Sequence, residues 1–281
     1  MHPNLPERLF PTARSEAATA NKPTSVPQTE HPAYALAFQD NDFLLKDEMR
    51  PVRLQLELAK ADLALAEAGI KSMFVFYGSA RIPAPEDAQA LVDNAKTDRE
   101  RAIAESLKAK SVYYEEARRL ARMVSGEGAM QRYFTVCSGG GPSIMEAANR
   151  GAADVGAPSV GLNIVLPFEQ VPNPYVTPGL SFQFHYFALR KMHFLMRAKA
   201  VAVFPGGFGT FDEMFELLTL IQTGKVAAMP IVLFGREFWN KIINFEALAD
   251  EGTINHADLE LFHMVDSAEE AWAIVREHYS I

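Results

Sequence analysis

The sequence predicts an α/β protein built on a doubly wound parallel sheet, with helices on both faces and an N-terminal helical extension. Short apolar runs that suit buried strands alternate with longer segments whose apolar residues have helical spacing. Three of these runs end in turns that contain glycine and lead toward a helix. Parallel strands joined by crossover helices produce this order, so we expect one Rossmann-like domain.

The N-terminal region is expected to add little to the core. Residues 1–31 are rich in Pro, Thr, Ser and Ala and contain few large apolar side chains, which is typical of a flexible tail. From Pro51 to Gly69, leucine and alanine recur at helical spacing, and the glycine is suited to end the helix. We therefore expect a tail over 1–31 and one domain over 32–281, whose first part, 32–70, is a helical extension.

The rest of the chain supplies the alternating elements of the predicted sheet. Strands are expected at 73–77, 133–137, 159–166, 180–184, 200–204 and 230–234. Helices are expected at 113–124, 187–197, 214–221, 238–250 and 268–279, and residues 144–149 are expected to open another. The highly charged stretch 86–110 predicts a solvated helical insertion between the first strand and the first of these helices.

Bulk properties exclude several classes of protein. The net charge of −8 argues against a general nucleic-acid binder, and no apolar run approaches the length of about 20 residues that spans a membrane. The N-terminus lacks the pattern of a signal peptide. The single cysteine, Cys137, leaves no internal disulfide and no multi-cysteine metal site. We expect a cytoplasmic protein without a metal, and Cys137 as a small core residue.

The segment 205–213, PGGFGTFDE, is the most informative part of the sequence. It follows a strand and precedes a helix, so its backbone N–H groups are expected at the positive end of a helix dipole, where phosphate binds readily. We expect Asp212 and Glu213 in the first helical turn, beside whatever the phosphate anchors. The segment predicts a site for a phosphorylated small molecule with carboxylates next to it.

Two other turns share this logic. Residues 138–143, SGGGPS, connect a predicted strand to a helix, and Gly78-Ser79 follows the first predicted strand. All three turns are expected at the carboxyl ends of strands, where ligands bind in open α/β sheets. Neither glycine-rich turn has the Gly-Lys-Ser/Thr ending of a P-loop, and 206–209 lacks the spacing of the dinucleotide fingerprint. The pattern favours a ligand of mononucleotide size.

These residues resemble a known family. The segment 205–213 resembles the PGGxGTxxE signature of the LOG (LONELY GUY) family, the cytokinin riboside 5′-monophosphate phosphoribohydrolases. Residues 138–152 resemble the family's other glycine motif, in the form found in its longer bacterial members. The pair Arg190-Lys191 resembles the family's Arg-Lys pair. The segment 76–80 resembles the family's first strand and the Gly-Ser turn that follows it.

The resemblance implies a homodimer, or a larger homo-oligomer, that hydrolyses the N-glycosidic bond of purine nucleoside 5′-monophosphates without a cofactor. The products are the free base and ribose 5-phosphate. Substrates in the family include AMP and N6-prenylated nucleotides such as isopentenyladenosine monophosphate, which belong to cytokinin biosynthesis, and many members carry the mistaken label lysine decarboxylase. The residues leave the identity of the base open. No nucleic-acid or membrane partner is expected.

Resemblance and chemistry together nominate Arg190 and Glu213 as the catalytic pair. Glu213 is expected to hold the ribose hydroxyls or to deprotonate the attacking water. Arg190 is expected to stabilise the leaving base or to hold the phosphate. The expected substrate- and phosphate-binding residues are Gly78, Ser79, Gly140, Gly141, Lys191, Gly206, Gly207, Gly209 and Thr210, with Asp212 and Met145 as further candidates.

Two other functions stay open at this point. A non-catalytic carrier for a nucleotide or a phosphorylated cofactor needs the glycine turns but not the acid. A pyridoxal-phosphate decarboxylase needs a Schiff-base lysine, and Lys191, Lys199 and Lys225 are available without a context that singles one out. His185 and His193 are expected to be polar packing residues.

Overall fold

The computed structural model describes residues 10–20, 24–126, 133–167 and 171–281. The chain divides into two compact units, Met1–Leu56 and Glu57–Ile281. No helix among the described residues is both long and apolar enough to cross a membrane. The two units are described separately below.

The first unit consists of short helices. It contains α1 (Ala13–Ala20), α2 (Pro27–Glu30), α3 (Asn41–Leu44) and the start of α4 (Arg50–Glu67). None of the described residues of α1, α2 and α3 is buried. The Asp40 carboxylate caps α3 by accepting from the Phe43 N–H at 2.9 Å, and the Arg53 guanidinium donates to the Leu44 carbonyl at 2.7 Å. Local hydrogen bonds, and no apolar core, hold these turns.

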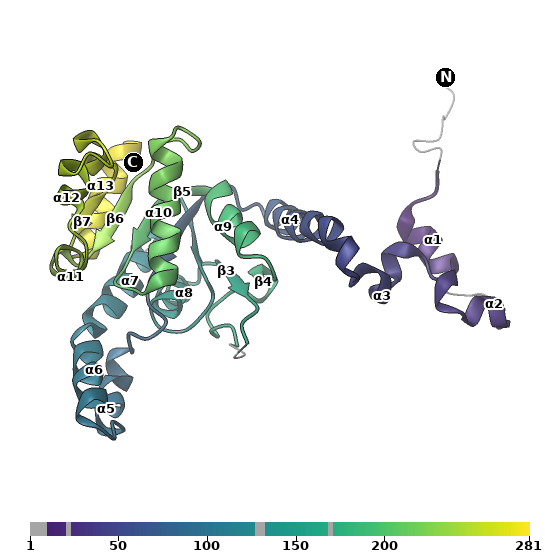
Figure 1. Ribbon diagram of the computed structural model, residues 1–281, viewed down its shortest axis with the longest axis horizontal. Helices are drawn as coiled ribbons and strands as arrows, with labels where there is room; N and C mark the ends of the chain where they lie inside the picture. Colours follow the sequence, from purple (N-terminus) through teal and green to yellow (C-terminus); the bar gives the residue numbers. More distant parts are fainter. Residues whose placement is uncertain (1–9, 21–23, 127–132, 168–170) are drawn as a thin grey trace. The chain divides into compact units, whose positions relative to one another are not determined.

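The second unit is built on a seven-stranded sheet in which every strand pair is parallel (Figure 1). Its strands are β1 (Met73–Tyr77), β2 (Thr135–Ser138), β3 (Ser159–Ile164), β4 (Ser181–Phe184), β5 (Ala198–Val203), β6 (Ile231–Phe234) and β7 (His263–Val265). They lie in the order β4-β3-β2-β1-β5-β6-β7. The chain moves outward from β1 to β4 and then returns to the other side of β1 with β5. The predicted doubly wound α/β fold is confirmed, and its switch point lies between β1 and β5.

Helices cover both faces of this sheet (Figure 1). They are α7 (Ser111–Val124), α8 (Ile144–Asp154), α9 (Phe187–Met196), α10 (Phe208–Gln222), α11 (Arg236–Ile242), α12 (Phe245–Asp250) and α13 (Ala268–Tyr279). Two further helices, α5 (Pro85–Asp93) and α6 (Asp98–Ala109), contact each other and α7 and extend away from the sheet (Figure 1). One core contains the buried residues of α7, α8 and α13, and the other contains those of α9, α10, α11, α12 and the C-terminal half of α4.

The alternation of side chains along β1 shows how one strand supports two cores. Phe74 and Phe76 point into the core with α7 and α8, whereas Met73, Val75 and Tyr77 point into the core with α9 and α10. All five side chains are buried, because helices cover both sides of the central strands. Every residue of β1 is therefore apolar or aromatic, which explains the continuous apolar run in the sequence.

Three elements differ from the sequence predictions. The expected helix 238–250 is two helices, because Ile243 is extended and the Asn244 side chain caps α12 by accepting from the Ala247 N–H at 3.1 Å. The charged stretch 86–110 likewise forms two helices, since Thr97 and Glu100 make a capping box that starts α6. The edge strand β7 was not predicted, because it has only three residues, too few to show a strand pattern.

Candidate functional site

The loops after β1, β2 and β5 meet at the switch point of the sheet. The Ser79 N–H donates to the Pro205 carbonyl at 3.1 Å, and the Ile144 N–H donates to the Ser79 carbonyl at 3.3 Å. The Gly78-Ser79 turn is therefore hydrogen-bonded both to the turn before α10 and to the start of α8. A Cβ on Gly78 would lie 2.5 Å from Ile144, so only glycine permits this approach. The convergence predicted from the sequence is present.

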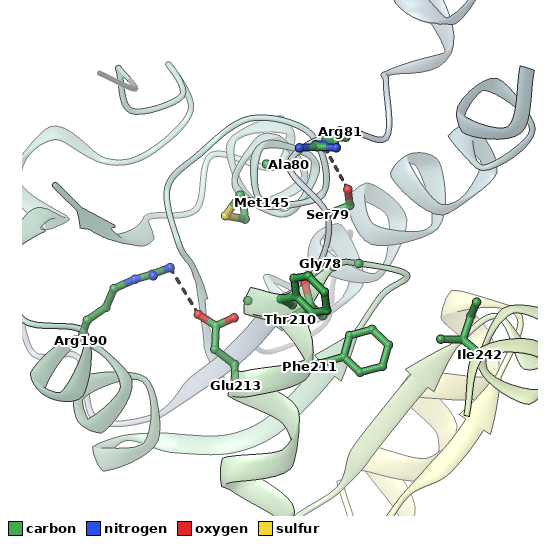
Figure 2. Close-up of a pocket in the computed structure, with 14 residues that line it drawn as sticks. Gly78, Ser79, Ala80, Arg81, Met145, Arg190, Thr210, Phe211, Glu213 and Ile242 are labelled. Atoms are coloured by element: carbon green, nitrogen blue, oxygen red, sulfur yellow. Dashed lines mark hydrogen bonds and ion pairs between the residues drawn. The ribbon is translucent and has the colours of Figure 1, made fainter. Parts of the chain in front are cut away.

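A cavity of about 730 Å³ opens between these loops, a size typical of small-molecule sites (Figure 2). It is lined by residues 78–81, Met145, Arg190, residues 206–211, Glu213 and Ile242. Figure 2 shows the 78–81 turn on one side of this space and Thr210 and Glu213, from α10, on the other. The cavity brings together nine of the predicted site residues: Gly78, Ser79, Met145, Arg190, Gly206, Gly207, Gly209, Thr210 and Glu213.

The N-terminus of α10 forms one wall of this cavity. The first backbone bond into the helix is donated by the Phe211 N–H to the Gly207 carbonyl at 3.1 Å, so the preceding N–H groups have no intrahelical acceptor. The Ser79 hydroxyl oxygen accepts from the Arg81 N–H at 3.0 Å, which leaves its proton available for a ligand. Backbone and hydroxyl donors at the positive end of a helix dipole make this wall suited to an anion.

Arg190 is held firmly between α9 and the sheet. Its Nε donates to the Leu162 carbonyl at 2.8 Å, and its guanidinium carbon lies 5.2 Å from the centre of the Phe194 ring. Only 9% of Arg190 is exposed. A Cβ on Gly139 would lie 2.7 Å from a guanidinium nitrogen of Arg190, so the glycine makes room for it. The remaining guanidinium nitrogen atoms face the cavity and Glu213.

Glu213 is the only carboxylate that lines the cavity among the residues that the structure describes. Its Oε1 lies 3.4 Å from an Arg190 nitrogen, and 13% of its side chain is exposed (Figure 2). Burial raises the pKa of Glu213 to about 7, and the nearby Arg190 charge opposes this only in part. A carboxyl group with such a pKa exchanges its proton near neutral pH, as a general base or acid requires.

The sequence prediction for the position of the two acids was wrong. α10 begins at Phe208, so Asp212 and Glu213 lie in its second turn and no acid lies in the first. The glycines at 206 and 207 let the helix start earlier than its apolar spacing indicates. Because Glu213 is one turn away from the helix N-terminus, the macrodipole does little to offset its burial.

Other predicted site residues lie outside the cavity. Lys191 pairs with Asp212 at 3.1 Å and with Glu216 at 2.9 Å on the outer face of α9 and α10. Gly140 and Gly141 are buried, and their carbonyls accept from the Asn173 backbone N–H and side-chain amide at 2.9 and 3.0 Å. The structure thus places Lys191, Asp212 and the two glycines beside the site, in contact with protein groups.

A second cavity of about 570 Å³ adjoins the first. It shares Ala80, Met145 and Arg190 with the first cavity and extends along Asn163, Gln183 and Phe187. Arg190 therefore stands at the junction of two spaces, with Glu213 in one of them. The Asn163 amide is fixed by donating to Ser181 Oγ at 3.2 Å and to the Phe182 carbonyl at 3.1 Å.

Sequence reasoning missed several lining residues. Arg81 stands two residues after Ser79, and this proximity was the available signal. Phe208 lies inside the recognised glycine turn and is 96% exposed. Ile242 enters the cavity from α11, which follows a different strand, so no local pattern connects it with the turns.

The structure also places the cysteine and histidine residues and the lysines that other reactions would require. Cys137 is fully buried, which raises the pKa of its thiol, as expected for a core residue. His193 is buried against Phe184, and His185 is exposed next to Tyr186. Within the described part of the chain, no lysine lines either cavity. Among the described residues, no group of three His, Cys, Asp or Glu side chains is arranged to hold a metal ion.

Comparison with known proteins gives a family match. A family model described as "Possible lysine decarboxylase" matches residues 145–275, which include Met145, Arg190 and Glu213. The chain is also similar to the X-ray structure of TM1055, with 20% identity, a TM-score of 0.45, and coverage of 74% of this chain and 99% of that chain. It is similar as well to the structure of the Moco carrier protein from Chlamydomonas reinhardtii, with 17% identity, a TM-score of 0.44, and coverage of 75% of this chain and 98% of that chain. These structural similarities are too low to transfer a function, and no curated protein matches the chain.

Proposed function

The chain belongs to the LOG family, whose domain is often labelled lysine decarboxylase, and on this basis we propose that it is a nucleotide N-glycosidase. The proposed reaction is hydrolysis of the bond between base and ribose in a purine nucleoside 5′-monophosphate. The observation that carries this proposal is the Arg190–Glu213 pair, 3.4 Å apart, in a cavity whose neighbouring wall is suited to phosphate.

The 5′-phosphate is assigned to the start of α10. The free N–H groups of 208–210 and the Ser79 hydroxyl supply donors on two sides of one space. Anchoring the phosphate here places the ribose along the direction of α10, toward Glu213 one turn further on. Binding energy from the phosphate, which does not react, can in this way position the anomeric carbon for attack.

Glu213 is assigned the role of general base. Cleavage of a glycosidic bond passes through an oxocarbenium-like transition state, so a neighbouring carboxylate favours the charge that develops on the sugar. With a pKa of about 7, a substantial fraction of Glu213 is ionised at neutral pH before the reaction. This carboxylate can then accept a proton from the attacking water. The water contributes hydroxide to the anomeric carbon, and the purine leaves with the pair of electrons from the broken bond. The proton that Glu213 accepted from the water then passes to the purine through solvent, which gives the free base and restores the carboxylate.

Arg190 is assigned to the leaving base. The departing purine gains negative charge, which a guanidinium held by Leu162 and Phe194 can stabilise without reorganising. The second cavity begins at Arg190, and Phe187 lines it, so it offers space and an aromatic surface for the base. The bond that breaks then lies between the two cavities.

Free base released from AMP and from isopentenyladenosine 5′-monophosphate, measured by chromatography, tests this proposal. The wild type should release base and ribose 5-phosphate in equal amounts from at least one nucleotide. Arg190→Ala and Glu213→Gln should each lower the rate by about 10²- to 10⁴-fold. Glu216→Gln, on the same helix but outside the cavity, is the matched control and should keep the wild-type rate.

The alternative of a non-catalytic binder makes a different prediction for the same samples. Nucleotide would bind tightly, no base would appear, and Glu213→Gln would bind as well as the wild type. A decarboxylase would instead need a lysine at the ligand, whereas the described residues that line the two cavities include none.

A further inference from the structure

The larger cavity contains two arginines with unlike surroundings. Among the described residues, Arg190 and Arg81 are the only cationic side chains that line it, and Glu213 is the only anionic one. Arg190 is bound to the Leu162 carbonyl, lies beside Glu213 and is nearly buried. Its charge is therefore already balanced within the protein.

Arg81 has no such partner. It is exposed, and among the described residues its guanidinium takes part in no hydrogen bond or ion pair. Its backbone is nevertheless fixed, because the Arg81 N–H donates to Ser79 Oγ at 3.0 Å and the Ser79 N–H donates to Pro205. The 78–81 turn thus holds an unneutralised guanidinium at the cavity, on the side opposite α10 (Figure 2).

We propose that Arg81 is a specificity-determining residue that binds the phosphate group of the ligand and makes the site select nucleotides over nucleosides. The inference rests on the proposed function only in taking a nucleoside monophosphate as the ligand. The donors at the start of α10 are uncharged, and Arg190 is committed to Glu213 and Leu162. Arg81 therefore supplies the positive charge at the cavity that is not already paired within the protein, and it offsets part of the charge of the dianionic phosphate.

The chemistry of the group supports this division of roles. A guanidinium presents parallel N–H donors that fit two phosphate oxygens, and such charged pairs are stronger than neutral hydrogen bonds. Because Arg81 is exposed, water and salt weaken its interaction, so its contribution is to affinity and not to bond cleavage. Loss of Arg81 should raise KM and leave kcat nearly unchanged, the reverse of what is expected for Glu213.

The test measures equilibrium binding of AMP and of adenosine in a Glu213→Gln background, where turnover does not interfere. Adding Arg81→Ala should weaken AMP binding about tenfold and change adenosine binding by less than about twofold. Adding Arg101→Ala, which removes an equal charge from an exposed site on α6, is the matched control and should change neither. The difference in AMP affinity between the proteins with and without Arg81→Ala should shrink when NaCl is raised to about 0.5 M.

Three results would overturn the inference. They are unchanged AMP affinity in the Arg81 variant, equal weakening of AMP and adenosine, and absence of AMP binding to any of the proteins. A selective loss of AMP affinity supports it even if the wild type releases no base. In that outcome the glycosidase proposal fails while the role of Arg81 stands, so the two failures are distinguishable.

Discussion

The two glycine-rich turns look alike in sequence, yet they face different partners in the structure. In the turn 138–143, added Cβ atoms on Gly139 and Gly140 would lie 2.7 Å from Arg190 and 2.4 Å from Asn163. In the turn 205–209, Gly207 and Gly209 would meet nothing within 4 Å and line the cavity. The first turn is glycine-rich so that protein groups can approach it, and the second leaves open space for a ligand.

The comparison teaches that a glycine motif alone does not reveal what approaches it. The first turn contributes to the site indirectly, since Gly139 makes room for the guanidinium of Arg190. The second turn is followed on its helix by Glu213, which lines the same cavity. Substitutions in the two turns should therefore have different effects on activity and stability.

Glu213→Gln should have the largest effect, because it removes the proposed base and keeps the size of the side chain. Base release from AMP should fall by about 10²- to 10⁴-fold, while the protein stays folded. Circular dichroism and steady-state rates on the same preparation check both points. A variant that retained the wild-type rate would remove the functional distinction between the two turns.

Gly140→Ala should cost stability. Gly140 has φ +70°, and the new methyl group would overlap the Asn163 amide, which is itself fixed by two hydrogen bonds. A left-handed residue and an overpacked contact together should lower the free energy of unfolding by about 2–4 kcal/mol. Urea denaturation measures this loss. Wild-type stability in this variant would contradict a packing role for the first turn.

The stability of the wild type should depend on pH through Glu213. Its folded pKa of about 7 lies above the ordinary value of 4.5, so the folded chain binds the proton more tightly than the unfolded chain does. The protonated carboxyl costs nothing below the unfolded value. Between pH 4.5 and about 7 the unfolded chain releases this proton while the folded chain still holds it. The free energy of unfolding therefore falls by about 1.4 kcal/mol per pH unit in this range.

Glu213→Gln should lack this decline. The difference in free energy of unfolding, variant minus wild type, should increase by about 3 kcal/mol from a pH below the unfolded pKa of Glu213 up to about pH 8. It should stay constant at higher pH. Denaturation series at several pH values, with Glu216→Gln as the control, measure this difference. A constant difference between the two proteins across this range would show that Glu213 ionises as freely as a surface carboxylate.

Gly209→Ala should have the smallest effect on stability and the opposite sign. Its methyl group would enter open space, and alanine is favoured over glycine in a helix by about 0.5 kcal/mol. The same methyl group would occupy part of the phosphate wall, so KM for AMP should rise about tenfold. Thermal unfolding measures the change in stability, and steady-state kinetics measure the change in KM for AMP. Unchanged KM would place the phosphate elsewhere.

Much of this comparison could be predicted from the sequence. The apolar run of β1 and the turn after β5 identified the sheet and its binding edge, because strand and turn patterns are local. The positions of Lys191, Gly140 and Gly141 relative to the cavity could not be predicted, since they depend on which side of a turn faces Asn173 or Glu216. The raised pKa of Glu213 could not be predicted either, because burial is a property of the assembled core.

The pH dependence of kcat/KM for AMP, in the wild type and in Glu213→Gln, tests whether Glu213 is the general base. If Glu213 acts as an ionised base beside the phosphate turn, its folded pKa of about 7 means that wild-type kcat/KM should rise with pH, reach half of its maximum near pH 7 and level off about one pH unit higher. Glu213→Gln should show a low value that does not change over this range. A variant with wild-type kcat/KM, or a wild type that releases no base at any pH, would contradict the account.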